Sequence, residues 1–231
     1  MPRPRLRKLD YQEFPPPRFH TPLPGPEDWK LWRAVGALYE LRGFELPASR
    51  WLPAQLSRQA EALAGEPYLA MELEVAGPAP VDLKTLLAPL ARGLPLRLAT
   101  VRRTDNPENV LRISQAERAA PPQHGQHRSC LRTWGPAASR WREDLRQKLV
   151  ESQVEPLLEG QVGLQLSWRC SSLQNWVELW RPTGDSLGPV LGERRPMRPR
   201  LERVSQMSLH LSLDDRLGMA VDVGYWWSLV G

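Results

Sequence analysis

Long apolar runs, cysteine and histidine are all scarce in this chain of 231 residues. No apolar run approaches the ~20 residues that a membrane-spanning helix needs. The two cysteines, Cys130 and Cys170, are too few for a disulfide framework or a tetrahedral zinc site, and the four histidines show no metal-ligand spacing. The basic residues 1 to 8 are not followed by the apolar stretch of a secretory signal. These absences predict a cytoplasmic protein that has no structural metal and does not contact a membrane.

Lysine is scarce as well. Only four of the 31 basic residues are lysine, which leaves 27 arginines in a chain of net charge +5. A guanidinium group is planar, always charged and well shaped to bind phosphate, so this usage favours a nucleic-acid partner. Codon usage in a GC-rich genome is the alternative explanation for the arginine count. The clustering is more informative, because the arginines gather in residues 128 to 148 and 192 to 203.

An internal repeat is the clearest organising feature of the sequence. Residues 41 to 51 (LRGFELPASRW) align with residues 131 to 141 (LRTWGPAASRW) at an offset of 90. Each copy continues with a helical pattern (52 to 64 and 142 to 158) and then an alternating strand (68 to 75 and 162 to 168). A second helix containing Leu-x-x-Pro follows in both, and the copies close on the tails 110 to 115 and 202 to 206. Agreement in order and spacing predicts a duplication.

The repeat predicts the fold class and the domain organisation. We expect an α/β (α+β) protein of two tandem two-layer units, each a small mixed sheet with helices on one face, related by a pseudo-two-fold axis. Residues 41 to 115 and 131 to 206 should superpose, and Trp51 and Trp141 should both be buried at equivalent positions. The expected divisions are a proline-rich arm (1 to 27), a first unit (28 to 118), a linker (119 to 130) and a second unit (131 to 231).

One stripe of charged residues in the second unit suggests phosphate chemistry. Glu178, Arg181 and Asp185 stand at i, i+3 and i+7 and therefore share a helix face. Carboxylates are the oxygen ligands that Mg²⁺ prefers, and such an ion neutralises charge in phosphodiester cleavage. A salt-bridged solvent face is the other interpretation of the same spacing. The first unit has no comparable set, and residues 102 to 109 there are expected to form a polar loop.

The second unit resembles a RusA-type Holliday junction resolvase over about 90 residues. That family has a basic helix after Trp-Arg, a strand Pro-x-x-Gly-x-Val-x-Leu-x-Leu, a motif Asp-x-Asp-Asn-x-x-Lys-x-x-x-Asp-x-Leu and a later Asp-Asp-x-x-Val. The matching segments here are residues 139 to 142 (SRWR), 156 to 166 (PLLEGQVGLQL), 175 to 187 (NWVELWRPTGDSL) and 201 to 204 (LERV).

The departures from that pattern fall on the metal ligands. Asn175 and Val177 stand where the family has its two metal-binding aspartates, and Glu178 replaces its asparagine. Asp185 matches the pattern, whereas the downstream Asp-Asp is replaced. If a site remains, the resemblance implies that Glu178, Asp185 and Glu202 are catalytic and that Asp185 and Glu178 bind Mg²⁺. No other cofactor is expected.

These observations lead to one main functional hypothesis and two alternatives. The main hypothesis is a RusA-like protein that binds branched or duplex DNA in recombination or repair and has lost most of its catalytic carboxylates. One alternative is a non-catalytic protein–protein interaction module, with a homo-oligomer or with a partner bound through the proline-rich arm; the other is an active Mg²⁺-dependent endonuclease with a rearranged site. The residues expected to contact nucleic acid are Arg128, Arg132, Arg140, Arg142, Arg146, Lys148, Arg181, Arg194, Arg195, Arg198, Arg200 and Arg203.

Overall fold

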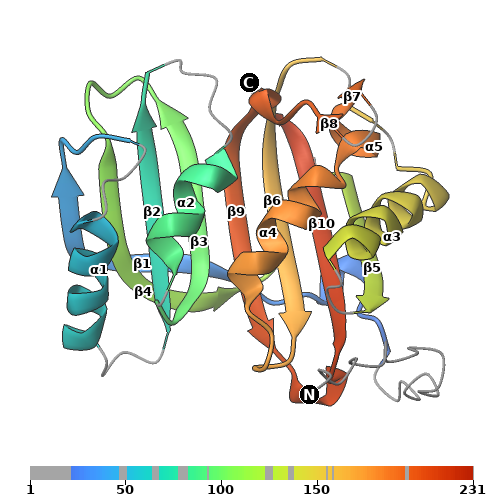
Figure 1. Ribbon diagram of the computed structural model, residues 1–231, viewed down its shortest axis with the longest axis horizontal. Coiled ribbons are helices and arrows are strands. Elements are labelled where there is room, and N and C mark those ends of the chain that lie inside the picture. Colours follow the sequence, from blue (N-terminus) through green and yellow to red (C-terminus); the bar gives the residue numbers. More distant parts are fainter. Residues whose placement is uncertain are drawn as a thin grey trace, which may run out of the picture.

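All the long strands in the part of the chain that the structure describes belong to one mixed sheet (Figure 1). The computed structural model describes residues 22–46, 51–63, 68–77, 83–92, 94–122, 127–134, 138–154, 156–157, 159–195 and 198–230. Most of the expected proline-rich arm and part of the expected linker lie outside these residues. Within them the sheet has eight strands in the order β1-β4-β2-β3-β9-β6-β10-β5, and the helices cover one of its faces.

Each half of the chain forms one half of the sheet. The first unit contains β1 (Leu31–Arg42), α1 (Trp51–Ala62), β2 (Leu69–Ala76), α2 (Leu83–Ala91), β3 (Leu96–Thr104) and β4 (Val110–Ala119), preceded by the short helix η1 (Pro26–Asp28). The second contains β5 (His127–Trp134), α3 (Ala138–Glu151), β6 (Gln161–Cys170), α4 (Trp176–Asp185), α5 (Gly188–Leu191), β7 (Glu193–Arg195), β8 (Arg198–Pro199), η2 (Leu201–Arg203), β9 (Val204–Leu213), η3 (Asp215–Leu217) and β10 (Ala220–Val230).

The two units have the same strand order and connectivity. The order β1-β4-β2-β3 in the first unit corresponds to β5-β10-β6-β9 in the second, with β2–β3 and β6–β9 as the parallel pairs. The predicted fold class is therefore confirmed. The structure adds that the two small sheets are continuous, because β3 pairs with β9 in antiparallel fashion at the centre.

The register identifies equivalent residues in the two units. Leu73 on β2 pairs with Val101 on β3, and Leu166 on β6 pairs with Leu209 on β9. The shift of 93 residues from Leu73 to Leu166 is also the shift between Pro89 in α2 and Pro182 in α4. Val101 on β3 and Leu209 on β9 are therefore counterparts. The other residues of β3 and β9 correspond in the same register, so that each residue of β3 matches the one equally far from Leu209 on β9.

The pseudo-two-fold axis passes through the centre of the sheet. Thr100 and Ser208 are counterparts by this register, and they also face each other in the β3–β9 pair, where Thr100 Oγ1 lies 3.4 Å from Ser208 Oγ. Two equivalent residues that face each other across antiparallel strands lie on a local two-fold axis. The two units are thus joined as a symmetric dimer would be.

Three details of the expected unit differ from the structure. The tails 110 to 115 and 202 to 206 are not equivalent, because the first lies in β4 and the second runs from η2 into β9, the counterpart of β3. The repeating unit has an outer strand before its first helix and two strands after its second helix. Strand β5 begins at His127, inside the segment expected as linker, because its backbone pairs with β10.

Alternation along the strands separates a helix-covered face from an open face. In β2, Met71, Leu73 and Val75 are buried in the main core beneath the helices, whereas Glu72 and Glu74 point to the other side. Trp141 on α3 is buried in the same core, as expected. The side chain of its predicted equivalent, Trp51, lies outside the described residues.

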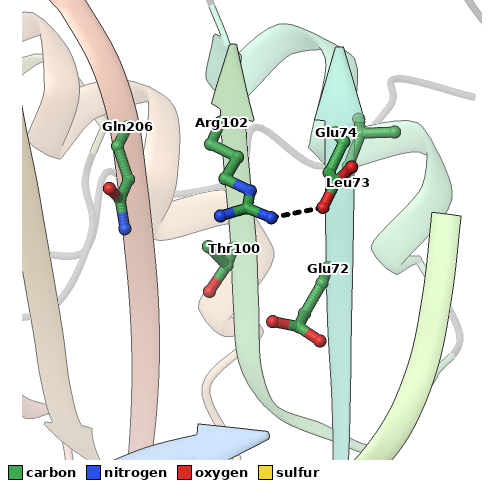
Figure 2. A pocket seen from close by; sticks show the side chains of 6 residues that line it. All are labelled: Glu72, Leu73, Glu74, Thr100, Arg102 and Gln206. Atoms are coloured by element: carbon green, nitrogen blue, oxygen red, sulfur yellow. Dashed lines mark hydrogen bonds and ion pairs between the residues drawn. The ribbon is translucent and has the colours of Figure 1, made fainter. Parts of the chain in front are cut away.

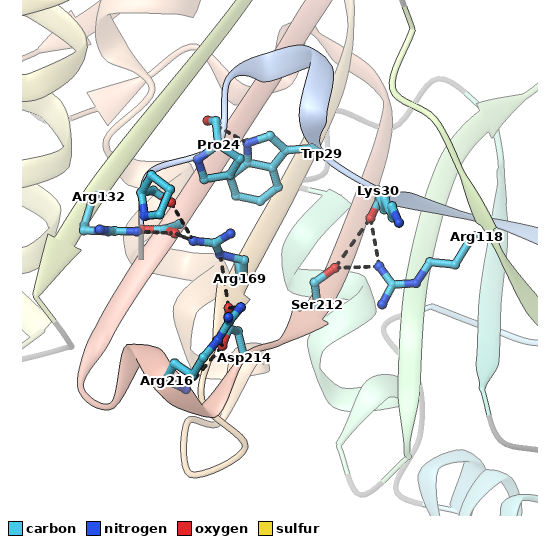
Figure 3. A network of polar contacts seen from close by, with 11 residues as sticks. Pro24, Trp29, Lys30, Arg118, Arg132, Arg169, Ser212, Asp214 and Arg216 are labelled. Atoms are coloured by element: carbon cyan, nitrogen blue, oxygen red, sulfur yellow. Dashed lines mark hydrogen bonds and ion pairs between the residues drawn. The ribbon is translucent and has the colours of Figure 1, made fainter. Parts of the chain in front are cut away.

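A strap crosses the open face of the second unit before the chain enters β1 (Figure 3). This strap consists of residues 22 to 32, the last two of which begin β1. Its Trp29 packs edge-on against Trp226, with ring centroids 5.9 Å apart, and Trp32 donates its indole N–H to the Leu211 carbonyl at 2.6 Å. Arg169 on β6 donates to the Pro22 carbonyl. The strap therefore ties the edge strand of the first unit to the open face of the second.

The strap buries His210 and should make stability depend on pH. The backbone N–H of Trp32 donates to His210 Nδ1 at 3.1 Å, and burial lowers the pKa of His210 from 6.5 to about 3. An unfolded chain binds a proton at this position below about pH 6.5, while the folded protein does not. The free energy of unfolding should thus be unaffected by His210 above pH 6.5 and fall below it by up to about 1.4 kcal/mol per pH unit.

Chemical denaturation of the wild type and of His210→Gln between pH 7.5 and about pH 5 measures this contribution. Glutamine can still accept the Trp32 N–H but does not titrate. We expect the stability difference between the two proteins to shift in favour of the variant as the pH falls. A difference that stays constant over this interval would contradict the burial of a neutral histidine.

Candidate nucleic-acid interface

Helix α4 carries the acidic stripe that the sequence predicted. Glu178 is exposed in its first turn, and Asp185 is its last residue. Arg181 is 84% exposed at its side chain, and its Nε lies 3.9 Å from Asp185 Oδ2. An exposed i, i+4 pair of this kind contributes only ~0.3–0.5 kcal/mol. The stripe has the geometry of a solvent-exposed ion pair on a helix surface.

The third candidate carboxylate, Glu202, forms ion pairs with two arginines. It lies on η2, where Arg194 Nη2 approaches its Oε1 to 2.9 Å and Arg200 Nε to 3.5 Å. Burial opposes the charged form of Glu202, but its own backbone N–H and Arg194 outweigh that effect and lower its pKa. Such a carboxylate stays ionised and serves to hold the two arginines in place.

The carboxylates do not assemble into a magnesium centre. Within the described part of the chain, no group of three or more His, Cys, Asp or Glu side chains is arranged to hold a metal ion. Val177, at one of the family's ligand positions, is buried in the core. Glu178, Asp185 and Glu202 therefore do not fit the multi-carboxylate set that metal-assisted hydrolysis needs.

Four of the predicted phosphate-binding side chains are engaged within the protein. Arg132 binds the buried Asp222, with Nε 2.6 Å from Oδ1, and Lys148 Nζ lies 2.8 Å from Asp144 Oδ2. Arg203 is buried and donates to the carbonyls of residues 157, 160 and 191. Arg146 binds a glutamate on β7, as described below. These contacts give the four side chains structural roles, and only the i, i+4 spacing of Lys148 and Asp144 is visible in the local sequence.

Four of the remaining arginines are exposed and lie on or beside the β7–β8 hairpin. The side chain of Arg194 is 69% exposed and that of Arg200 is 44% exposed. Arg195 and Arg198 are exposed and form no ion pair with any residue that the structure describes. Arg142 on α3 is half-buried, and the side chains of Arg128 and Arg140 lie outside the described residues.

An ion pair brings the two arginine clusters of the sequence together. Arg146 on α3 donates from Nε to Glu193 Oε1 on β7 at 2.8 Å. Helix α3, α5 and the β7–β8 hairpin accordingly lie at one end of the second unit (Figure 1). We define the basic surface by its exposed arginines: Arg181, Arg194, Arg195, Arg198 and Arg200.

The hairpin is an addition to the duplicated unit. Only residues 92 to 95 separate α2 from β3 in the first unit, whereas residues 186 to 203 separate α4 from β9 in the second. The added segment carries most of the basic surface. Because the rest of the fold repeats without it, the hairpin is not needed to complete the sheet.

Sequence reasoning missed a second polar group of residues, on the open face of the first unit. Glu74 is buried there and binds both Arg102 and Arg112, and Arg112 also binds Glu40 at 2.6 Å. Figure 2 shows the pocket beside this network, lined by Glu72, Leu73, Glu74, Thr100, Arg102 and Gln206. The alternation of glutamates in β2 was the available signal.

Comparisons of the chain with models of known protein families and with curated proteins find no match. In the described residues, no helix combines the length and apolar character needed to cross a membrane.

Proposed function

We propose that this protein binds nucleic acid through the basic surface and does not cleave it. The main support for this proposal is the β7–β8 hairpin, which adds exposed arginines to one copy of a duplicated unit. The hairpin contacts the basic helix α3 through the ion pair of Arg146 and Glu193. Arg195 and Arg198 pair with no carboxylate among the described residues and are available to phosphates, and the partners of the other surface arginines leave those side chains 44–84% exposed. The resemblance of the second unit to RusA-type resolvases favours DNA, branched or duplex, as the nucleic acid.

The mode of binding follows from the side chains at the surface. Every tryptophan whose side chain the structure describes is buried, so none of these rings can stack on an unpaired base. Phosphate contacts position a duplex without reading its sequence. We therefore propose sequence-tolerant binding that prefers double-stranded or branched DNA to single strands.

The absence of cleavage in this proposal rests on the carboxylates. Glu202 holds Arg194 and Arg200, and Glu178 lies exposed on α4. In the family's pattern, Asn175 and Val177 occupy the metal-ligand positions. We further propose a cytoplasmic location, with which the free thiols of Cys130 and Cys170 agree.

Neutralising the hairpin arginines should weaken DNA binding at low salt. Five phosphate contacts would give a log–log slope of affinity against salt of about −4.5. The triple variant Arg194→Gln, Arg195→Gln, Arg198→Gln should reduce the magnitude of that slope by about 2–3 and weaken binding to all duplex sequences alike. Fluorescence anisotropy with labelled duplexes of two unrelated sequences measures both effects.

A matched control removes the same charge elsewhere. Arg33, Arg42 and Arg216 are exposed and lie away from the hairpin, on β1 and η3. Their triple change to glutamine should leave the slope close to that of the wild type. Equal weakening by both triple variants would show that net charge, rather than the basic surface, governs binding.

A further inference from the structure

The pocket on the open face of the first unit presents opposite charges to one small space (Figure 2). Glu72 on β2 turns its carboxylate toward β3, below the guanidinium of Arg102. Glu72 forms no hydrogen bond or ion pair with any described residue, whereas the pocket's other glutamate, Glu74, is buried and bound to Arg102. Thr100 and Gln206 complete the polar lining with a hydroxyl and an amide.

The Arg102 guanidinium is held so that part of it faces the pocket. Glu74 binds one terminal nitrogen of Arg102, and Arg112 Nη1 fixes Glu74 from the other side at 2.8 Å. Figure 2 shows the second terminal nitrogen of Arg102 turned toward β9, where Gln206 lies. A guanidinium fixed on one side and free on the other is preorganised to bind a carboxylate.

The second unit shows what this part of the sheet accommodates. The pseudo-two-fold places Ser167, His210 and Leu98 at the counterparts of Glu74, Arg102 and Gln206. There the strap covers the sheet: the Trp32 backbone N–H donates to His210, and the Trp32 ring packs in one cluster with Leu98. Among the described residues no segment covers the pocket in the first unit, and its Arg102 side chain is 57% exposed.

The polarity and size of the pocket define its ligand. An occupant must offer a hydrogen-bond acceptor to Arg102 and a cationic donor to Glu72. In this it differs from the strap, whose backbone N–H donates to His210. The pocket has a volume of about 120 Å³, somewhat less than the roughly 150 Å³ of a cavity that binds benzene, so its occupant must be small. A carboxylate and an ammonium group joined by one carbon fit both requirements.

We propose that this pocket binds the head group of a free α-amino acid. Arg102 and the Gln206 amide receive the carboxylate, Glu72 receives the ammonium group, and the amino-acid side chain extends toward solvent. The site lies on the opposite face of the sheet from α3 and α4, so the proposal does not depend on nucleic-acid binding.

A nuclear magnetic resonance titration of the ¹⁵N-labelled full-length protein tests this site with glycine, acetate and methylammonium at equal ionic strength. We expect saturable shifts of the amides around residues 72, 102 and 206 with glycine, and binding of the two single-charge probes that is about tenfold weaker or more. Glycine shifts that do not saturate, or acetate that binds as tightly as glycine, would overturn the proposal.

Two variants separate the pocket from a general charge effect. Glu72→Gln should weaken glycine binding about tenfold or more because it removes the partner of the ammonium group. Gln206→Ala should weaken glycine binding to a smaller extent. Gln206 is exposed and its side chain forms no hydrogen bond with a described residue, so this variant tests the site if Glu72→Gln does not fold. Glu117→Gln on β4 removes an exposed carboxylate outside the pocket and should bind glycine as the wild type does. Wild-type affinity in Glu72→Gln, or in Gln206→Ala when Glu72→Gln does not fold, would contradict the assignment.

Discussion

Replacement of Asp222 by alanine is expected to lower the free energy of unfolding by about 3–5 kcal/mol. Asp222 is fully buried on β10 beneath the strap. Its Oδ1 accepts from Arg132 Nε at 2.6 Å, and its Oδ2 lies 2.8 Å from Arg169 Nη2. Without the carboxylate, two largely buried guanidinium groups lose their shared partner, and this is more costly than the pairing itself is stabilising.

Urea denaturation of Asp222→Ala against Glu117→Ala provides the measurement and its control. Glu117 pairs with Arg33 at 3.1 Å, but both side chains are more than half exposed, so its loss should cost less than about 1 kcal/mol. If Asp222→Ala is as stable as Glu117→Ala, the strap does not enclose this network in solution.

Replacement of Trp141 by alanine should cost about 3–5 kcal/mol, because it leaves a large cavity in the core. The ring is 2% exposed and lies between α3 and the sheet, in the same cluster as Trp168. Val150 lies on the same helix and is 53% exposed, so Val150→Ala should change stability by less than about 0.5 kcal/mol.

Thermal or chemical unfolding of both α3 variants at one pH compares the two effects directly. A loss below about 1 kcal/mol for Trp141→Ala would mean that α3 does not pack against the sheet through this residue. The basic surface would then lose the helix that carries Arg146, so this stability measurement also bears on the proposed interface.

The repeat made the duplication predictable from sequence, because its signals are local. Ser-Arg-Trp marks the first helix of each unit, and Pro89 and Pro182 occur at matching places in the second helices. The alternating strands β2 and β6 also lie where the pattern predicted them, since a half-buried strand imposes period two on its own residues.

The continuous sheet was not predictable in the same way. The pairing of β3 with β9 joins residues more than 100 positions apart, and no local pattern specifies it. Arg102 and Arg103 were assigned to a polar loop, but they belong to the end of β3, where Arg102 lies on the open face beside Glu74. Charge alone does not distinguish a loop from the exposed half of a strand.

The candidate interface was only partly predictable for a related reason. Arg132 and Arg203 look like Arg195 in sequence, yet the first two are held by Asp222 and by backbone carbonyls. Their partners lie between 12 and 90 residues away along the chain. Which arginines remain available to a ligand is therefore a property of tertiary packing and not of the local sequence.

Titration of the full-length protein with a four-way junction and a linear duplex, at two salt concentrations and with and without Mg²⁺, measures DNA binding and cleavage together. We expect binding that falls steeply as salt rises, does not require Mg²⁺ and leaves both DNAs intact. Absence of binding even at low salt would contradict this expectation and favour a protein–protein interaction module. Mg²⁺-dependent cleavage that disappears in Asp185→Asn would contradict it in the other direction, by showing that Glu178 and Glu202 join Asp185 in a working metal site.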